Sequence, residues 1–476
     1  MSDGASGLAP MRAIFAQQRA AARREIPSFE KRRAQLIALE RTIRGHERAL
    51  CEALCEDFGH RSFYETRLVE VLASINGARY ARANLARRLR PERRRVSPWF
   101  WPSTAHVIHR PAGVVGIIAP WNYPVHLALA PFAQSLAAGN RTMMKLSEGV
   151  PRTSALVARM IGEAFSSEDA HVVEGDAQVA RTFATLPFDH LLFTGSTAVG
   201  RDVMRAAAEN LTPVTLELGG KSPALVGPDA PLDVAARRIL WGKLFNAGQT
   251  CTAPDYALVP KERLETFVAA AGAAVRALEP ASRVSSRTTI VDDVHHARLR
   301  ALLDDARARG ATVVELGDEL GAGAAGERTF RPALVLGADA SARVMREEIF
   351  GPILPVLGYA ALEEAFGVIE RLPPPLAAYL FAADPALRER FLAAVPAGGV
   401  TIDGTLLHYV QDDLPFGGHG ASGIGRYHGR EGFETFSRTQ AVFVQRGIGG
   451  FVGSDLLRPP YGIVADGLIR LMQLWS

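Results

Sequence analysis

The amino-acid sequence predicts an α/β protein whose mostly parallel sheets are covered by helices on both faces. Short apolar segments alternate with helical segments from residue 113 onward, and a second series with the same alternation starts near residue 217. The chain has 476 residues, roughly three times the length of about 150 residues expected of one domain. Two α/β units in series are therefore the simplest account.

The composition is typical of a folded globular protein, with 48% hydrophobic and 22% charged residues. The net charge of +4 is small, and we interpret the arginine-rich stretch 87–95 as a solvated helix end rather than a nucleic-acid patch, because no aromatic residues interleave it. We find no signal-peptide pattern and no apolar run of about 18 residues. Cys51, Cys55 and Cys251 do not make a disulfide framework, so we expect the reducing cytoplasm.

The elements of the first unit can be taken in order. Residues 11–90 have helical spacing, and one long amphipathic pattern ends at Gly59. The segment 98–111 has prolines, aromatics and a β-type alternation, which predicts a hairpin or a crossing arm. Beyond it we predict strands and helices in alternation, at 113–120, 127–140, 141–148, 153–165 and 170–176.

The second unit begins with an apolar strand that contains Glu217 and continues with α and β segments to about residue 400. The stretch 412–437 is dense in glycine, which suggests backbone threading through a crowded site or interface.

Several polar residues follow predicted strands, where open α/β sheets bind their ligands. Asn122 is braced by two prolines, and its carboxamide N–H suits a developing oxyanion, although a rigid turn with a hydrogen-bonded Asn is the alternative. Gly195 and Ser196 open a helix whose N-terminus suits pyrophosphate, or form a generic turn. Lys145 and Glu148 close another strand and have the chemistry to hold ribose hydroxyls.

Glu217 and Cys251 have the chemistry of a base and a nucleophile. A carboxylate buried in a strand has a raised pKa and can act as a base near neutrality, although a structural hydrogen bond is the alternative for Glu217. Cys251 lies in the polar, turn-prone stretch "FNAGQTCTAPDY". Backbone N–H groups near such a turn can favour a nucleophilic thiolate.

Together these motifs resemble the NAD(P)-dependent aldehyde dehydrogenase superfamily. The order "PWN", "K-x-S-E", "FTGSTxVG", "ELGGKSP", "GQTC", "EEIFGP" and "PFGG" spans residues 117–418. The stretches "GQTCTAPDY" and "SGIGRYHGREGFETFS" resemble the class 3 branch, and "EDFGHRSFYET" and "TLLHYVQDDLPFGG" are most similar to bacterial coniferyl aldehyde dehydrogenases.

The resemblance implies a Rossmann-like parallel-sheet cofactor domain, a second α/β catalytic domain and a small β arm for bridging or oligomerisation. On this basis we assign 1–97 and 112–216 to NAD(P) binding and 217–411 to catalysis. The segments 98–111 and 412–440 would bridge subunits, and 441–476 would form a C-terminal tail with an amphipathic pattern.

The resemblance also implies roles for individual residues. Cys251 would be the nucleophile, Glu217 the base that activates water, and Asn122 the side-chain half of the oxyanion hole. The cofactor-binding residues would be Trp121, Gly195 and Ser196 at the pyrophosphate, Lys145 and Glu148 at the adenosine ribose, and Glu348 and Phe350 at the nicotinamide end. No metal is implied.

The implied function is oxidation of an aromatic, coniferyl-type aldehyde to its carboxylate with NAD, or with NADP as the alternative cofactor. The class 3 resemblance also implies medium-chain or fatty aliphatic aldehydes as alternative substrates. Asp403-Gly404 departs from the class 3 pattern near the substrate entrance, which leaves the choice of aldehyde open. Two less favoured functions are those of a coenzyme-A-acylating aldehyde dehydrogenase and of a non-catalytic, membrane-associated protein. We expect a homodimer with no nucleic-acid partner and no transmembrane span, whose tail contacts a subunit or a membrane surface.

Overall fold

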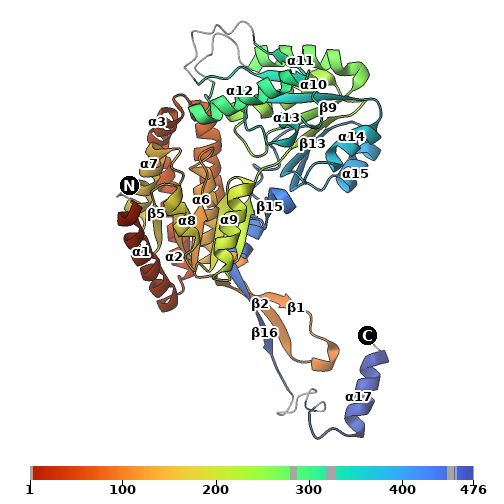
Figure 1. Cartoon of the computed structure of the whole chain (residues 1–476). Coiled ribbons are helices and arrows are strands. Elements are labelled where there is room, and N and C mark those ends of the chain that lie inside the picture. Colours follow the sequence, from red (N-terminus) through yellow and green to blue (C-terminus); the bar gives the residue numbers. More distant parts are fainter. Residues whose placement is uncertain (1–3, 279–286, 318–327, 448–454, 456–457, 475–476) are drawn as a thin grey trace.

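The computed structural model describes residues 4–278, 287–317, 328–447, 455 and 458–474. Two α/β units each contain a mostly parallel sheet, and a three-stranded sheet extends from one of them as an arm (Figure 1). The arrangement is the predicted α/β class. Strands β7 and β8 lie in different sheets, so the chain passes from the first unit to the second between residues 217 and 223.

The first unit has a six-stranded sheet in the order β15-β7-β6-β3-β4-β5. All neighbours are parallel except β15, which runs antiparallel to β7. Because β3 lies between β4 and β6, the chain reverses its direction of travel across the sheet there, which creates a switch point for ligand binding. The strands are β3 (Val114–Ile118), β4 (Arg141–Lys145), β5 (Ala170–Val173), β6 (His190–Thr194), β7 (Val214–Glu217) and β15 (Gly423–Ile424).

Helices cover both faces of this sheet, as the fully apolar β3 requires. Val115 and Ile117 join one core, and Val114 and Ile118 join the other, because successive side chains of a strand alternate. The first core is shared with α2 (Phe29–Gly45), α3 (Glu47–Phe58), α5 (Ala73–Arg88), α6 (His126–Ala138) and α7 (Pro151–Ala164), and the second with α1 (Gly4–Arg24), α8 (Ala177–Ala184) and α9 (Thr197–Ala208).

Two local features of these helices depend on particular residues. The single amphipathic pattern predicted to end at Gly59 forms two helices, α2 and α3, which separate at His46. Between α3 and α5 lie α4 (Phe63–Glu65) and the π-helix η1 (Thr66–Leu72). Helix α6 ends at Gly139, as predicted, because its φ of 91° is the left-handed conformation that glycine adopts easily.

The second unit has a seven-stranded sheet in the order β10-β11-β12-β9-β8-β13-β14, parallel except for the β10–β11 pair. Its strands are β8 (Pro223–Val226), β9 (Tyr256–Pro260), β10 (Thr312–Glu315), β11 (Ala333–Leu336), β12 (Ile353–Tyr359), β13 (Ala377–Phe381) and β14 (Gly399–Ile402). Its helices are α10 (Leu232–Leu244), η3 (Phe245–Gly248), η4 (Lys261–Arg263), α11 (Leu264–Leu278), α12 (Asp293–Ala308), α13 (Arg343–Arg346), α14 (Leu362–Glu370) and α15 (Pro385–Ala394).

The arm consists of β1 (Glu92–Arg94), β2 (Thr104–Pro111) and β16 (Ser437–Val444), with η2 (Pro98–Phe100) between the first two strands. Before β16, the chain returns to the first unit through η6 (Gly420–Ser422), β15 and α16 (Gly429–Thr435). Helix α17 (Ile463–Leu474) lies beyond the arm, apart from both α/β units in Figure 1. The last two residues of the predicted tail, 475–476, lie outside the described residues.

Candidate active site

One cavity of about 230 Å³ brings most of the predicted site residues together. It lies at the carboxyl ends of β3, β6 and β7, opposite loops of the second unit, which is the edge where parallel sheets bind ligands. All the predicted site residues except Lys145 and Glu148 line it, namely Trp121, Asn122, Gly195, Ser196, Glu217, Cys251, Glu348 and Phe350.

Lys145 and Glu148 lie at the end of the neighbouring strand β4 and outside the cavity lining. The Lys145 Nζ is 3.3 Å from a Glu148 carboxylate oxygen, with the lysine buried and the glutamate half-exposed. Burial lowers the pKa of Lys145, while Glu148 opposes that shift. The half-exposed Glu148 carboxylate thus faces solvent beside the cavity. The role of Lys145 and Glu148 at the adenosine ribose stays a prediction.

Sequence reasoning missed the part of the cavity wall that α12 supplies from the second unit, which consists of His295 and Arg298. The His295 and Trp121 rings lie 4.8 Å apart, and Trp121 is 5.4 Å from Phe350. The Arg298 guanidinium donates to the backbone oxygens of Glu348 and Ile349. His295 and Arg298 are three residues apart and therefore share one face of a helix, which the sequence alone could show. Nothing in the neighbouring sequence indicates that this face lines the cavity.

A strained turn places Cys251 at the cavity. Asn246, Ala247 and Gly248 have φ values of 52°, 53° and 74°, three consecutive left-handed residues. A Cβ on Gly248 would lie 2.4 Å from the Gly351 carbonyl oxygen, so only glycine allows this approach. Gln249 then ties the loop down by donating to Asn246 and Thr289 and accepting from the backbone N–H of Val291. The loop is therefore fixed before substrate arrives.

The Cys251 thiol is protonated at neutral pH in this structure. Burial raises its pKa to about 12, and the carboxyl groups of Glu348 and Glu217 add to the shift. The backbone N–H groups of Cys251 and Thr252 lower the pKa, as the sequence led us to expect, but burial outweighs them. The thiol needs a base, or a positive charge in the cavity, to become nucleophilic.

Glu217 and Glu348 have buried carboxyl groups, and both residues line the same cavity as Cys251. Burial raises the pKa of Glu217 well above its usual value, and its oxygens accept no hydrogen bond from residues that the structure describes. Burial and the charge of Asp255 raise the pKa of Glu348 to about 8. A Cβ on Gly219 would lie 2.0 Å from Glu348, so this glycine lets the carboxyl group approach the backbone. Both groups therefore hold a proton more readily than exposed carboxyl groups do.

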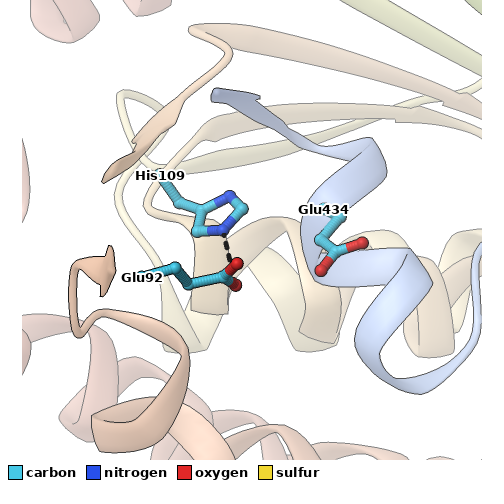
Figure 2. A group of neighbouring side chains, drawn as sticks. All are labelled: Glu92, His109 and Glu434. Atoms are coloured by element: carbon cyan, nitrogen blue, oxygen red, sulfur yellow. Dashed lines mark hydrogen bonds and ion pairs between the residues drawn. The ribbon is translucent and has the colours of Figure 1, made fainter. Parts of the chain in front are cut away.

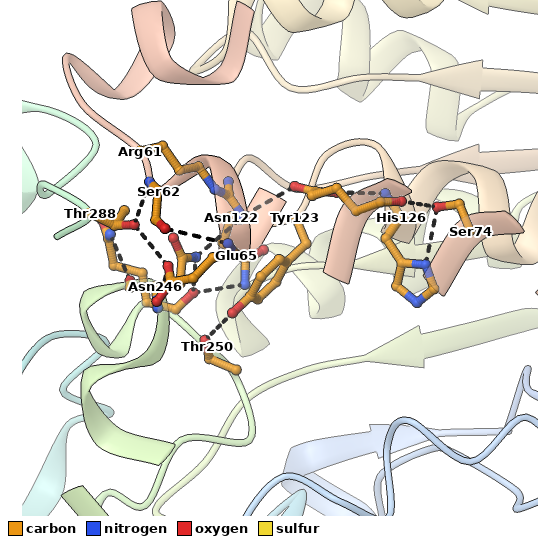
Figure 3. Close-up of polar contacts among 12 residues, drawn as sticks. Arg61, Ser62, Glu65, Ser74, Asn122, Tyr123, His126, Asn246, Thr250 and Thr288 are labelled. Carbon is orange, nitrogen blue, oxygen red and sulfur yellow. Dashed lines mark hydrogen bonds and ion pairs between the residues drawn. The ribbon is translucent and has the colours of Figure 1, made fainter. Parts of the chain in front are cut away.

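Asn122 is held from three directions (Figure 3). Its Nδ2 donates to the Gln249 carbonyl at 3.1 Å, and its own carbonyl accepts from Arg61 at 2.9 Å and from Asn246 Nδ2 at 3.2 Å. A carboxamide nitrogen carries two hydrogens, so the second N–H of Asn122 remains available. Asn246 and Gln249 belong to the Cys251 loop, so these bonds join the two α/β units at the candidate oxyanion site.

A buried ion pair supports this turn, and sequence reasoning missed it. Arg61 and Glu70 are fully buried and 3.2 Å apart, and the Arg61 guanidinium lies 4.6 Å from the Phe58 ring and 5.2 Å from the Tyr123 ring. A Glu70 oxygen accepts the backbone N–H of His126 at 2.7 Å, at the start of α6. The pair therefore holds the turn at two points, because Arg61 bonds to Asn122 itself and Glu70 bonds to the start of α6.

A second cluster, Glu92, His109 and Glu434, lies where the arm meets α16 (Figure 2). Its three ligand atoms lie within 4.8 Å of one another. The Arg430 guanidinium contacts Glu434 at 2.5 Å and Glu92 at 3.5 Å, and Arg94 contacts Glu92 at 2.9 Å. Since two guanidinium groups already neutralise the carboxylates, we interpret the cluster as an ion-pair network that anchors the arm.

The sequence profile of the aldehyde dehydrogenase family matches residues 11–442. The chain belongs to this family. The "probable coniferyl aldehyde dehydrogenase" of Pseudomonas aeruginosa is 46% identical over 95% of this chain and 94% of its own length. These matches confirm the predicted family and enzyme class, an NAD(P)-dependent aldehyde dehydrogenase.

Solved structures of the family share the fold. The substrate-bound state of Staphylococcus aureus AldH superposes with a TM-score of 0.90 at 34% identity, covering 98% of this chain and 99% of that one. A Mycobacterium tuberculosis aldehyde dehydrogenase complexed with NAD+ has a TM-score of 0.83 at 27% identity, covering 94% and 92%. The predicted fold is thereby confirmed. No helix among the described residues is long and apolar enough to cross a membrane.

The Arg61–Glu70 pair predicts separable effects on stability and on turnover. Arg61→Met leaves a buried carboxylate unpaired and should cost about 3–5 kcal/mol of unfolding free energy. The double variant Arg61→Met/Glu70→Gln should recover most of the thermal stability, because no unpaired charge remains. Its kcat should stay about 10- to 100-fold low, since Asn122 has lost a hydrogen bond that positions it. A double variant with wild-type kcat would show that Arg61 acts only on stability.

The raised pKa of Cys251 predicts alkylation that accelerates with pH. An acid with a raised pKa keeps its proton at neutrality and loses it as pH rises, so the thiolate fraction grows about tenfold per pH unit below the pKa. Iodoacetamide should modify Cys251 about 100 times faster at pH 9 than at pH 7, with peptide mass spectrometry separating it from Cys51 and Cys55. Glu348→Gln should raise the rate at pH 9. A plateau below pH 8 in the free enzyme would contradict the assigned pKa.

Proposed function

We propose that this protein oxidises an aromatic aldehyde of the coniferyl type to its carboxylate, using NAD+. The observation that carries the proposal is the single cavity in which Asn122, Glu217 and Cys251 meet. The 46% identity to a relative named for coniferyl aldehyde supports the substrate class. Aliphatic aldehydes are the alternative substrates.

In the proposed reaction the Cys251 thiol loses its proton to water, and the thiolate sulfur then bonds to the aldehyde carbon. The carbonyl oxygen becomes an oxyanion that the free N–H of Asn122 and the backbone N–H of Cys251 stabilise. One such donor typically contributes about 3–4 kcal/mol to the transition state. After oxidation a thioester remains on Cys251, and water activated by Glu217 hydrolyses it to release the carboxylate.

The cavity suits a nicotinamide dinucleotide, which accepts the hydride when bound. Ser196 caps α9, whose N-terminus favours phosphate oxygens. Glu348 Oε1 and Thr194 Oγ1 are buried without a hydrogen-bond partner among the described residues, and hydroxyl groups of a ribose would satisfy them. Trp121 and Phe350 supply flat apolar walls. We assign Lys145 and Glu148 to the adenosine ribose, where the exposed Glu148 carboxylate would repel a 2′-phosphate and favour NAD over NADP.

We further propose a homodimer of the cytoplasm. Strand β16 is an edge of the arm sheet, and its Phe443 and Val444 are exposed, so the edge is suited to contact a second copy. Free thiols at all three cysteines suit a reducing compartment. Helix α17 exposes Ile463 and Leu474 and forms the predicted amphipathic tail, for which a second subunit or a membrane surface is the proposed partner.

Removing the nucleophile tests the core of this proposal. Cys251→Ala should abolish NADH formation from any aldehyde, because no other thiol lines the cavity. NAD+ binding, measured by calorimetry, should change little, since the alanine leaves the other wall residues in place. Turnover that survives the substitution would remove Cys251 from the mechanism.

Glu217 is tested by its isosteric amide. Glu217→Gln cannot take a proton from water, so the enzyme should stop at the thioester after one burst of NADH per active subunit in stopped-flow absorbance. Asp229→Asn, a change of a carboxylate in the second unit away from the cavity, serves as the control and should turn over steadily. Wild-type steady-state turnover in Glu217→Gln would exclude Glu217 as the base.

A further inference from the structure

Asp255 is a buried residue that directly precedes β9, four residues after Cys251. Its side chain is 3% exposed, and it lies outside the cavity lining. Any effect of Asp255 on the proposed reaction therefore acts through other residues. Its side-chain contacts belong to the segments that follow Glu217 and Glu348, two residues that do line the cavity.

The Asp255 carboxylate holds the segment that carries Glu348 and Phe350. Its Oδ1 accepts the backbone N–H of Ile349 at 3.1 Å, in a buried hydrogen bond. Arg298 donates to the Ile349 carbonyl, so both backbone polar groups of this residue have a charged partner. Since Glu348 precedes Ile349 and Phe350 follows it, these two bonds fix the backbone that carries both proposed cofactor contacts.

The same segment is strained where it reaches the cavity. Phe350 has a φ of 51°, in the left-handed region that residues with a Cβ adopt only where the surrounding structure holds them there. Its ring lies 5.4 Å from Trp121 in the cavity wall. A strained segment relaxes when an anchor is removed, so the bond from Asp255 to Ile349 keeps the Phe350 ring in that wall.

Two buried lysines and one backbone bond hold Asp255 itself. Lys221 pairs with one carboxylate oxygen and also donates to the Val344 carbonyl of α13 at 2.5 Å. The Lys243 Nζ lies 3.6 Å from the other carboxylate oxygen. The backbone N–H of Asp255 donates to the Ser222 carbonyl at 2.7 Å. The carboxylate is therefore a fixed point, and a bond from a backbone N–H to such a charged acceptor is stronger than one between neutral groups.

The thiol has anchors that do not involve the Asp255 side chain. On one side of Cys251, the Thr252 carbonyl accepts the hydroxyl of Tyr379. On the other side, Gln249 donates to two backbone carbonyls. The thiol and the cofactor segment are thus held by separate contacts, so removal of the Asp255 carboxylate should disturb the second and leave the first in place.

We propose that Asp255 is a positioning residue for hydride transfer, because its bond to Ile349 holds Glu348 and Phe350 in place relative to Cys251. The inference rests on the proposed aldehyde oxidation and assigns part of one step to a residue outside the cavity. Hydride transfer depends steeply on the placement of the reacting groups, so a small displacement of these two contacts lowers its rate.

The test removes the carboxylate and measures cofactor binding, the first turnover and thiol reactivity separately. Asp255→Ala deletes the acceptor of the Ile349 N–H. NAD+ should bind about tenfold more weakly in calorimetry. The rate constant for NADH formation in a single turnover, with enzyme in excess of coniferyl aldehyde and with saturating NAD+, should fall about 10- to 100-fold. Alkylation of Cys251 by iodoacetamide at pH 7, without cofactor, should change less than about threefold. Partial unfolding would instead lower the amplitude of the single turnover and leave its rate constant unchanged.

A second variant covers a folding failure of the first, which leaves two buried ammonium groups without their partner. Asp255→Ala/Lys243→Met removes one of those two groups, so the buried positive charge no longer exceeds that of the wild type. The Ile349 N–H still lacks its acceptor. Thermal stability should therefore rise above that of Asp255→Ala, while the single-turnover rate constant stays low.

The matched control is Asp229→Ala. The Asp229 carboxylate also accepts backbone N–H groups in the second unit, those of Ala383 and Asp384 at 2.7 Å, and it lies outside the cavity lining. This variant should keep the wild-type rate constant and NAD+ affinity. A folded Asp255 variant that also keeps both would overturn the inference and leave the proposed function standing. Failure of the wild-type enzyme to form NADH from any aldehyde would instead overturn the proposed function.

Discussion

The backbone carbonyl of Asn122 is the point on which the rest of the site depends. It accepts hydrogen bonds from Arg61, in the first unit, and from Asn246, in the loop that carries Cys251. These two donors fix the separation between the switch point of one sheet and the candidate nucleophile of the other unit. The strain of the left-handed residues around Asn246 is sustained because these bonds over-determine the loop. A preorganised site of this kind needs no rearrangement when charge develops on the substrate oxygen.

Burial is the second constraint, and it determines the protonation states. It raises the pKa values of Cys251, Glu217 and Glu348 together, which disfavours negative charge in the cavity of the free enzyme. This shift avoids the cost of three adjacent negative charges in a low-dielectric site. It also makes the reactivity of the thiol depend on what enters the cavity.

The sequence predicts the parts of this site that are encoded locally. Asn122 and Gly195 each follow a strand of the first unit, and parallel strands deliver their carboxyl ends to one edge, so their convergence was predictable. The strand that contains Glu217 was predicted to open the second unit, whereas β7 pairs with β6 in the first sheet. The roles of Arg61 and Glu70 were not predictable from the sequence, because their side chains bond to Asn122 and His126, which lie far along the chain. The break between α2 and α3 at His46 interrupts a continuous amphipathic pattern, which periodicity alone does not reveal. The high pKa of Cys251 likewise depends on burial by residues from both units, which the sequence around Cys251 does not reveal. That local sequence indicates only the backbone N–H groups, and these lower the pKa.

The central claim is that Cys251, held opposite Asn122, becomes the site of a covalent acyl intermediate. Mass spectrometry of peptides from enzyme quenched in acid during turnover of coniferyl aldehyde and NAD+ tests it most directly. The account predicts a mass increase equal to the acyl group on the peptide that contains Cys251, which hydroxylamine removes. Acylation of Cys51 or Cys55 instead, or no adduct on any cysteine while NADH accumulates, would contradict it.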